Sequence, residues 1–292
     1  MPSVLWDVLA PVSRKREDGT SGSENSRQHD LGIRDGVAKP WLRRSVERSS
    51  AMIGRAMFPT AHHAQPLIVG FYGDGPALIG EALFDFFNTV PLSGPRTELC
   101  RIMTRFKSDK GSGWHNYTLL YDFLFRHRRF EVEHVFELGL GTNFTDVPSN
   151  CGPNASPGAS LRGWREYFPQ AKIFGADIDR RVLFSEDRIS TFYVDQLSPE
   201  AIGEMWAAIG QEEFDIIIDD GLHLFESSSC FFRHSYGRLR KWGYYIIEDI
   251  VITDENLQKY HNHFADLSVS GVIVKIPNAY NNYDNCLGIF RG

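Results

Sequence analysis

The chain has 292 residues, of which 42% are hydrophobic, so it is long enough to bury a full core. Its formal net charge of -6 and pI near 5.9 argue against a nucleic-acid-binding surface, which requires clustered Lys and Arg. The four cysteines form no CxxC pair, so neither a zinc site nor a disulfide framework is indicated. Neither a membrane span of ~20 apolar residues nor a secretory signal is recognisable. We therefore expect a cytoplasmic enzyme with no nucleic-acid or membrane partner.

The N-terminal segment, residues 1–65, differs in composition from the rest of the chain. Its first 60 residues contain ten Lys and Arg against seven Asp and Glu. The stretch from Arg16 to Gly36 offers few apolar side chains to bury, so we expect a flexible or auxiliary segment. Residues 41–58 have the spacing of a short amphipathic helix that could contact another subunit of a homo-oligomer, and a disordered tail is the alternative.

Residues 66–130 are expected to form a helical lead-in that precedes the main domain. The apolar spacing in this part of the chain has the helical period, and a turn-like KSDKGSG separates the last two predicted helices. The predicted helices cover residues 76–90, 96–106 and 115–127.

Predicted strands and helices then alternate through residues 131–292, which predicts a doubly wound, mostly parallel α/β sheet. The linker 277–285 is too short for a crossover helix, so the last two strands should form an antiparallel hairpin. The seven predicted strands cover residues 134–139, 172–178, 189–195, 214–220, 244–250, 268–276 and 286–292. Helices between the first five strands are expected at residues 160–168, 180–184, 199–210 and 227–241.

The fourth predicted strand ends in two carboxylates, within the sequence FDIIIDDGLH. Three consecutive isoleucines fit a strand that is covered on both faces, and Asp219 and Asp220 follow at the sheet edge where such folds bind ligands. His223 comes three residues after Asp220, about one helical turn, so both side chains can face one cleft. In the alternative interpretation, one aspartate caps the next helix and His223 has no role.

The first predicted strand ends in a turn with two glycines, Gly139 and Gly141. Glycine allows a sharp turn and the close approach of a ligand to the backbone. A dinucleotide fingerprint would have a third glycine where Phe144 stands. Asp177 and Asp195 end the next two strands, where an acid can accept hydrogen bonds from ribose hydroxyls and an adenine amino group, respectively. Each acid could instead be a helix cap, and the glycine turn could be purely structural.

Two sets of motifs carry a resemblance to known families. The motifs ELGLGTN, GADID, YVDQ, IIIDDGLH and YYIIEDI resemble those of class I S-adenosylmethionine-dependent methyltransferases. Over residues 106–292 the chain more narrowly resembles the metal-dependent O-methyltransferases of macrolide sugars, the mycinamicin and macrocin type, through SDKG, HNYTLLYDFLF, ASLRGWREYFP, DDGLH and IIEDI. The resemblance implies a Rossmann-like methyltransferase domain over residues 131–292 with the strand order 3-2-1-4-5-7-6 and an antiparallel last strand.

The resemblance also implies the positions of S-adenosylmethionine and Mg²⁺. The metal ligands would be Asp220, Glu248 and Asp249, three hard oxygen donors that suit Mg²⁺, and His223 would be the general base. Asp219 would border the cofactor or orient the loop instead of binding metal. The residues expected to bind the cofactor are Glu137, Gly139, Gly141, Asp177, Asp195, Ser108, Lys110 and Asp219.

Together these features predict a Mg²⁺-dependent O-methyltransferase that acts on a hydroxyl of a sugar or a glycosylated metabolite. A nucleotide-binding oxidoreductase or hydroxylase on the same architecture is the alternative, because a fold alone does not determine the chemistry. A binding scaffold without turnover is the third hypothesis. Two departures from the family are a long loop after the glycine turn and Leu222 in place of a small polar residue. The Pro and Gly content of the loop suits an ordered lid over the cofactor or substrate, and a simple insertion is the alternative.

Overall fold

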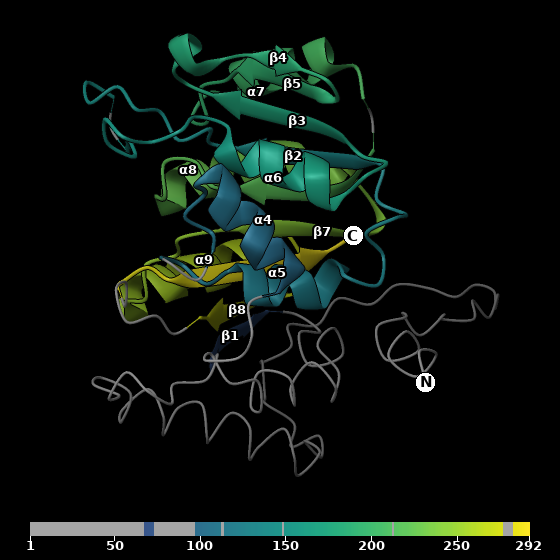
Figure 1. Cartoon of the computed structure of the whole chain (residues 1–292). Helices are drawn as coiled ribbons and strands as arrows, with labels where there is room; N and C mark the ends of the chain where they lie inside the picture. The colour runs from purple at the N-terminus through teal and green to yellow at the C-terminus, as the bar shows by residue number, and fades with distance from the viewer. Residues whose placement is uncertain (1–66, 73–96, 112–113, 148, 212, 277–282) are drawn as a thin grey trace, which may run out of the picture.

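The computed structural model describes residues 67–72, 97–111, 114–147, 149–211, 213–276 and 283–292 (Figure 1). The N-terminal segment, the helix predicted over residues 76–90 and part of the final linker lie outside the described residues. Within the described part of the chain, no helix is both long and apolar enough to cross a membrane.

Nine strands of the described residues form one sheet in the order β1-β8-β9-β7-β6-β2-β3-β5-β4. Five neighbouring strands, β5-β3-β2-β6-β7, are parallel, while β9 runs antiparallel to both β7 and β8. The strands are β1 Leu67–Tyr72, β2 His134–Leu138, β3 Lys172–Asp177, β4 Ser185–Glu186, β5 Ile189–Tyr193, β6 Phe214–Asp219, β7 Leu239–Ile247, β8 Gly271–Lys275 and β9 Cys286–Arg291.

The strand order predicted from the sequence is confirmed. The predicted order 3-2-1-4-5-7-6 corresponds to β5-β3-β2-β6-β7-β9-β8, and the final hairpin between β8 and β9 is antiparallel. Two strands were not predicted. β4 pairs with β5 at one edge of the sheet, and β1 pairs with β8 at the other edge, within the segment that was expected to be only helical.

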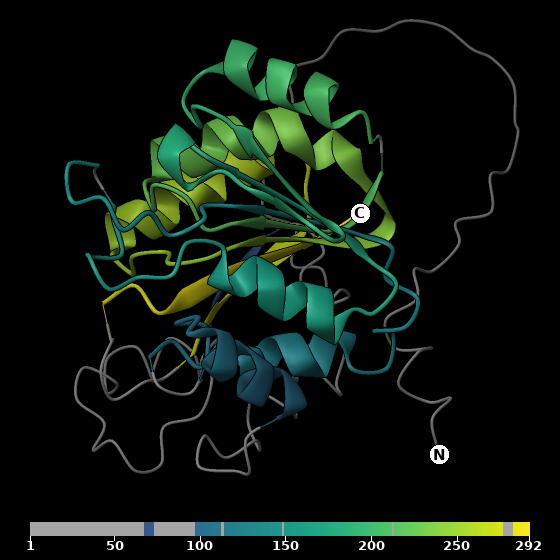
Figure 2. The ribbon, with the colours of Figure 1, turned by 45° about the horizontal axis from the view of Figure 1, so that its top comes forward.

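Six α-helices of the described residues cover the two faces of the sheet. Figure 2 shows α4, α5 and α6 on one face and α7, α8 and α9 on the other. The helices are α4 Glu98–Phe106, α5 Thr118–Phe125, α6 Ala159–Tyr167, α7 Pro199–Ile209, α8 Phe225–Ser235 and α9 Asp254–Asp266.

The observed helices and strands differ from the predicted ones at three places. Residues 180–184 were expected to be helical, but a short 3-10 turn, Arg180–Val182, leads directly into β4. The helix expected over residues 227–241 ends at Ser235, because residues 239–241 already belong to β7. Helix α9 was not assigned from the sequence, although Thr253 caps it by accepting from the backbone N–H of Asn256.

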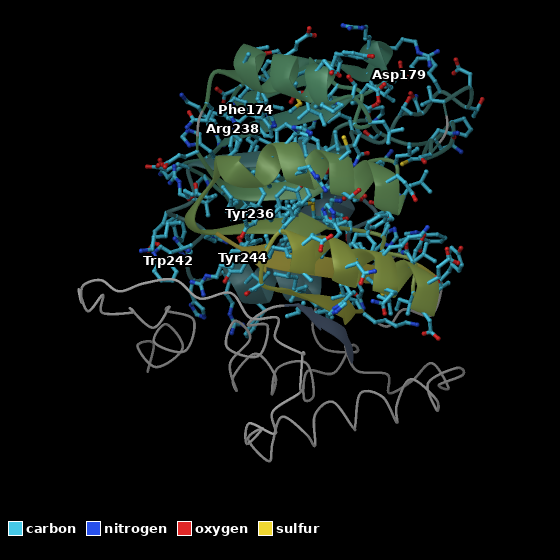
Figure 3. All side chains as sticks on the ribbon, turned by 180° about the vertical axis from the view of Figure 1, so that it is seen from behind. Phe174, Asp179, Tyr236, Arg238, Trp242 and Tyr244 are labelled. Atoms are coloured by element: carbon cyan, nitrogen blue, oxygen red, sulfur yellow. The ribbon has the colours of Figure 1, made fainter. Side chains whose placement is uncertain are left out.

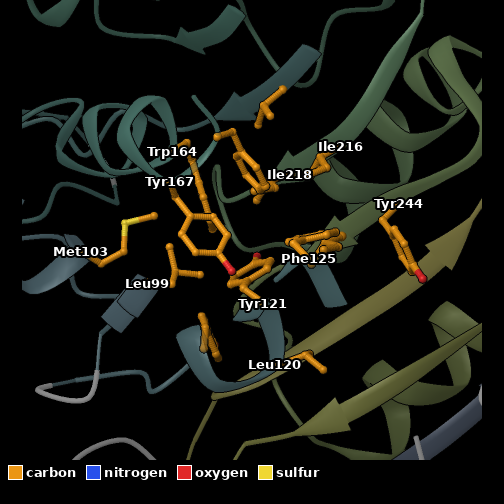
Figure 4. Close-up of a cluster of buried hydrophobic side chains, with 14 of the residues drawn as sticks. Leu99, Met103, Leu120, Tyr121, Phe125, Trp164, Tyr167, Ile216, Ile218 and Tyr244 are labelled. Atoms are coloured by element: carbon orange, nitrogen blue, oxygen red, sulfur yellow. The ribbon is translucent and has the colours of Figure 1, made fainter. Parts of the chain in front are cut away.

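Each face of the sheet has its own hydrophobic core. Ile216 and Ile218 of β6 pack in the cluster under α4, α5 and α6, whereas Ile217 packs in the cluster under α7, α8 and α9. Figure 4 shows the first cluster, where Trp164 and Tyr121 meet edge to face with ring centroids 5.1 Å apart. The three isoleucines therefore fill both cores, which is why this strand is apolar at consecutive positions.

The carboxyl ends of the five parallel strands meet at one side of the molecule. In Figure 3 Asp179, just after β3, lies on the opposite side from Trp242, which is near the start of β7. Because open α/β sheets bind ligands at the carboxyl edge, the functional residues are expected on the side marked by Asp179.

Candidate active site

The turn after β2 contacts the turn after β6 at the carboxyl edge. Gly139 has a φ of +89°, and a Cβ atom on it would lie 1.9 Å from the backbone oxygen of Asp220. The backbone N–H of Asp220 in turn donates to the carbonyl of Leu138 at 3.0 Å. Only glycine permits this approach, so the sequence at Gly139 brings the two strand ends into direct contact.

These turns border a cavity of about 570 Å³, which is large enough for a drug-sized ligand. Seven of the predicted site residues line it: Gly139, Gly141, Asp177, Asp195, Asp220, His223 and Asp249. The lining also includes residues to which no binding or catalytic role was assigned from the sequence, among them Asp109, Thr142, Ile178, Gln196 and Leu197.

Asp177 and Asp195 lie in the wall of the cavity that the ends of β3 and β5 form. Asp177 accepts from the backbone N–H groups of Leu140 and Asp179, both at 2.8 Å, so it also fixes the glycine turn. Burial raises the pKa of Asp177, while these backbone hydrogen bonds oppose the rise. Asp195 accepts from the N–H of Leu197 at 2.9 Å. Both carboxylates therefore keep lone pairs for additional donors.

Two apolar side chains flank the acids in this wall. Ile178 and Leu197 line the cavity and are 46% and 50% exposed, respectively. They follow Asp177 and Asp195 by one and two residues. An acid next to an exposed apolar side chain suits a ligand that combines polar hydroxyls with a flat ring.

Asp220, His223 and Asp249 form a cluster at the side of the cavity near β6 and β7. One ligand atom from each residue lies within 4.8 Å of the others. His223 Nε2 lies 3.2 Å from Asp220 Oδ1 and 3.6 Å from Asp249 Oδ2. His223 and Asp249 both have positive φ angles, of 60° and 54°, respectively, which are uncommon for residues other than glycine but are adopted by His and Asp more often than by most.

The charges within this cluster shift the pKa values of its members. Burial lowers the pKa of His223, but the hydrogen bond and the negative charge of Asp220, together with Asp249, outweigh burial and raise it to about 10. Burial favours neutral Asp220, yet the charge of Lys110 and the hydrogen bond from His223 hold the pKa of this carboxyl well below its usual range. A site this rich in carboxylate attracts cations.

Glu248, the third predicted metal ligand, does not line the cavity. Its Oε2 accepts from Lys110 Nζ at 2.7 Å, and its Oε1 accepts from the hydroxyl of Tyr121. Burial raises the pKa of Glu248, and the charge of Lys110 opposes the rise. The structure thus brings Asp220 and Asp249 together with His223, while Glu248 lies beside them with both oxygens bonded.

Four residues predicted to bind the cofactor also lie outside the cavity lining. Glu137 accepts from Ser160 and from the Trp164 indole, which joins β2 to α6. Asp219 is 2% exposed and accepts from Gln196 Nε2 at 2.7 Å, and burial raises its pKa to about 6. The other two residues are Lys110, whose side chain is 1% exposed, and Ser108, whose hydroxyl accepts from the N–H of Lys110 at 3.4 Å.

Two tyrosines of the helical lead-in have roles that the sequence did not reveal. Tyr117 donates to Asp249 Oδ1 at 2.5 Å, and Tyr121, four residues later, donates to Glu248. The two hydroxyls therefore orient both acids that follow β7. Tyr117 directly precedes α5 and Tyr121 lies in its first turn, and their spacing of four residues is the sequence signal that could have indicated a shared role.

The long loop after the glycine turn contributes residues to the cavity lining, among them Asp146 and Cys151. Arg181 forms two hydrogen bonds to the carboxylate of Asp146, at 3.0 and 3.1 Å, and its guanidinium lies 3.9 Å from the ring centroid of Phe144. Thr142 donates to Asp179 at 2.7 Å. These contacts join the loop to the turn after β3, so it lies over the part of the cavity that Asp177 borders.

No protein-family model matches the chain. Among curated proteins, demethylmacrocin O-methyltransferase of Streptomyces fradiae is 30% identical over 82% of this chain and 56% of its own length. The 8-demethyl-8-(2-methoxy-alpha-L-rhamnosyl)-tetracenomycin-C 3'-O-methyltransferase of Streptomyces olivaceus is 37% identical over 52% of this chain and 37% of its own length. The chain thus spans about half or less of the curated relatives it matches.

Among solved structures, MycE methyltransferase from the mycinamycin biosynthetic pathway, in complex with Mg and SAH, has a TM-score of 0.50 and 24% sequence identity. The match covers 75% of this chain and 62% of that chain. The curated relatives confirm the resemblance to macrolide-sugar O-methyltransferases, and the solved structure confirms the class I methyltransferase fold.

Proposed function

We propose that the chain is a Mg²⁺-dependent O-methyltransferase that transfers the methyl group of S-adenosylmethionine to a sugar hydroxyl of a glycosylated small molecule. The observation that carries this proposal is the single cavity in which a glycine turn, two strand-end acids and the cluster of Asp220, His223 and Asp249 meet. The curated relatives are named as methyltransferases of glycosylated tetracenomycin and of macrocin-type substrates, which supports a sugar hydroxyl as acceptor.

The cofactor would lie along the wall formed by the ends of β2, β3 and β5. Gly139 and Gly141 both line the cavity, so their backbone borders the space that a ligand would occupy. Asp177 can accept from ribose hydroxyls, and Ile178 and Leu197 offer apolar surface to the adenine ring.

The donor set at the other end of the cavity fits Mg²⁺. Carboxylate oxygens from Asp220 and Asp249 are the hard ligands that this ion prefers, and Mg²⁺ keeps several positions for water and substrate hydroxyls. We assign Asp220 and Asp249 as ligands. Glu248 would join them after its Oε2 is released by Lys110.

His223 would remove the proton from the acceptor hydroxyl. When bound, Mg²⁺ lowers the pKa of a coordinated hydroxyl and neutralises the carboxylates that raise the pKa of His223. The acceptor oxygen would form a bond to the methyl carbon as the carbon–sulfur bond of S-adenosylmethionine breaks, and the proton of the hydroxyl would move to the His223 ring. Asp220 Oδ1 lies 3.2 Å from Nε2 and orients the ring, so Nδ1, the nitrogen that Asp220 does not hold, would take the proton.

The oxidoreductase hypothesis is not supported. Sixteen residues, 142–157, separate Gly141 from Gly158, the N-cap of α6, so the glycine turn does not open directly into a helix as the dinucleotide fingerprint requires. Phe144 stands where a third glycine would be needed, and its ring contacts Arg181.

The test is methyl transfer from labelled S-adenosylmethionine to glycosylated acceptors, with the matching aglycones as controls. We expect transfer to the glycosides only, loss of transfer with EDTA and recovery with Mg²⁺. The substitution Asp220→Asn should abolish transfer, whereas His223→Ala should lower kcat by about 100-fold or more with little change in cofactor affinity. Full activity of Asp220→Asn after chelation would refute the metal assignment.

A further inference from the structure

Lys110 is a buried cation among the acids of the candidate active site. Its side chain is 1% exposed, whereas lysine is almost never fully buried unless it is paired. Nζ lies 2.5 Å from Asp220 Oδ2, 2.7 Å from Glu248 Oε2 and 3.8 Å from Glu137 Oε1. Three carboxylates from the ends of β2, β6 and β7 thus surround one ammonium group.

We propose that Lys110 is the internal counter-ion of the metal site: it holds Asp220 and Glu248 in place in the metal-free protein and competes with the divalent ion for the same oxygens. Lys110 would then be a positioning residue that sets the Mg²⁺ affinity and does not bind the cofactor. The part of this inference that concerns Mg²⁺ rests on the proposed function, whereas the part that concerns the metal-free protein does not.

The first argument is the charge of the metal-free site. Glu137, Glu248 and Asp249 are buried and the side chain of Asp220 is 20% exposed, so four negative charges lie close together where water screens them little, and they repel one another. Lys110 supplies a positive charge that forms direct hydrogen bonds to two of the four carboxylates. Removing one partner of a buried pair leaves an uncompensated charge, so the loss of Lys110 should destabilise the metal-free protein.

The second argument is that the backbone fixes the position of the ammonium group. The carbonyl of Lys110 accepts from the N–H of Thr118 at 3.1 Å, and the carbonyl of Gly111 accepts from the N–H of Asn116 at 3.0 Å. The carbonyl of Asp109 accepts from the N–H of His115 at 3.0 Å. The segment is therefore bound to the start of α5, where Tyr117, just before the helix, bonds Asp249, and Tyr121, within it, bonds Glu248.

The third argument is that Lys110 and the cluster share one carboxylate. Asp220 presents Oδ1 to His223 at 3.2 Å and Oδ2 to Lys110 at 2.5 Å. Both oxygens of Glu248 are bonded, one to Lys110 and one to Tyr121. A divalent ion that binds Glu248 Oε2 would have to share this oxygen with Lys110 or displace it, and it binds against the charge of the ammonium group.

The experiment compares wild type, Lys110→Met and the control Tyr121→Phe by thermal unfolding in EDTA and by calorimetric titration with MgCl₂ at pH 8. Methionine keeps most of the side-chain volume without the charge, and Tyr121→Phe removes an uncharged donor from the same Glu248. We expect Lys110→Met to unfold at a lower temperature in EDTA and to bind Mg²⁺ at least about tenfold more tightly, which is about 1.4 kcal/mol. Tyr121→Phe should change the Mg²⁺ affinity by less than about threefold.

The outcomes separate this inference from the proposed function. If wild type binds Mg²⁺ and Lys110→Met binds it equally or more weakly, competition by Lys110 is refuted. If wild type binds no Mg²⁺, the metal part of the proposed function fails, and the competition fails with it. Unchanged unfolding of Lys110→Met in EDTA would refute the counter-ion role. Should Lys110→Met not fold, Lys110→Gln provides the same comparison with an uncharged polar side chain.

Discussion

The substitution Glu137→Gln distinguishes a structural role for this acid from the cofactor-binding role predicted from the sequence. Glu137 is fully buried, accepts from Ser160 and from the Trp164 indole, and lies 3.8 Å from Lys110. Glutamine has the same shape but no charge, and only one of its two terminal atoms can accept a hydrogen bond. One of the two donors is therefore left facing an NH₂ group.

The size of the effect follows from these contacts. A hydrogen bond to a charged group contributes about 1.5–3 kcal/mol, and a buried donor left without a partner costs about 1–3 kcal/mol. Removal of a buried charge recovers part of this loss. We expect the free energy of unfolding to fall by about 2–3 kcal/mol, which for a chain of this size lowers Tm by about 5–10 °C.

The assay is urea denaturation with S-adenosylhomocysteine titrations in parallel. Glu186→Gln is the matched control, because Glu186 also has two partners, Arg162 and Arg165, but its side chain is 34% exposed. A surface ion pair of this kind contributes at most about 1 kcal/mol. If Glu137→Gln kept wild-type stability but lost affinity for S-adenosylhomocysteine, the structural role would be refuted and the cofactor-binding role supported.

Two further predictions concern the glycine turn and the loop above it. Gly139→Ala should lower the free energy of unfolding by more than about 2 kcal/mol, because a positive φ and the Asp220 carbonyl both oppose a Cβ atom. Gly210→Ala is the control, because Gly210 also has a positive φ but no atom lies within 4 Å of the added Cβ. It should lower the free energy of unfolding by about 1 kcal/mol. Equal losses in urea denaturation would contradict the contact between the two turns. Arg181→Ala should speed amide exchange in residues 143–147, since Arg181 contacts Asp146 and Phe144. Unchanged exchange would show that other contacts hold the loop.

The fold could be predicted because its central strands are marked by local sequence patterns. The three isoleucines of β6 mark a strand buried on both faces, and the short linker before β9 allows only a hairpin. By contrast, β4 has only two residues, which is too short for a period to be recognised. β1, with the sequence LIVGFY between Pro66 and Gly73, does have the composition of a strand, whereas its pairing with β8, about 200 residues away in the chain, has no local signal.

Part of the candidate site could be predicted, because the fold determines where the strand ends lie. Carboxyl ends of neighbouring parallel strands meet at one edge, so Asp177, Asp195 and Asp220 were expected to lie together, and all three line the cavity. The partners of Glu248 were not predictable, because Lys110 and Tyr121 are 138 and 127 residues away in the sequence. No local pattern encodes contacts at such separations.

The glycine-turn motif predicted that Glu137 binds the cofactor, but the alternation of side chains along β2 indicates a different orientation. Side chains alternate between the faces of a strand, so Glu137 lies on the face of Val135, which packs in the cluster under α4, α5 and α6. Phe136 packs in the other cluster. The alternation of β2 thus directs the carboxylate toward α6, and this could have been read from the sequence.

The most direct test of the proposed function is a calorimetric titration of the purified protein with S-adenosylhomocysteine, with and without Mg²⁺, and with NAD as the comparison ligand. We predict micromolar binding of S-adenosylhomocysteine, as expected for an enzyme cofactor site, and no binding of NAD. If protein free of copurified cofactor binds no S-adenosylhomocysteine under either condition, the methyltransferase assignment is contradicted.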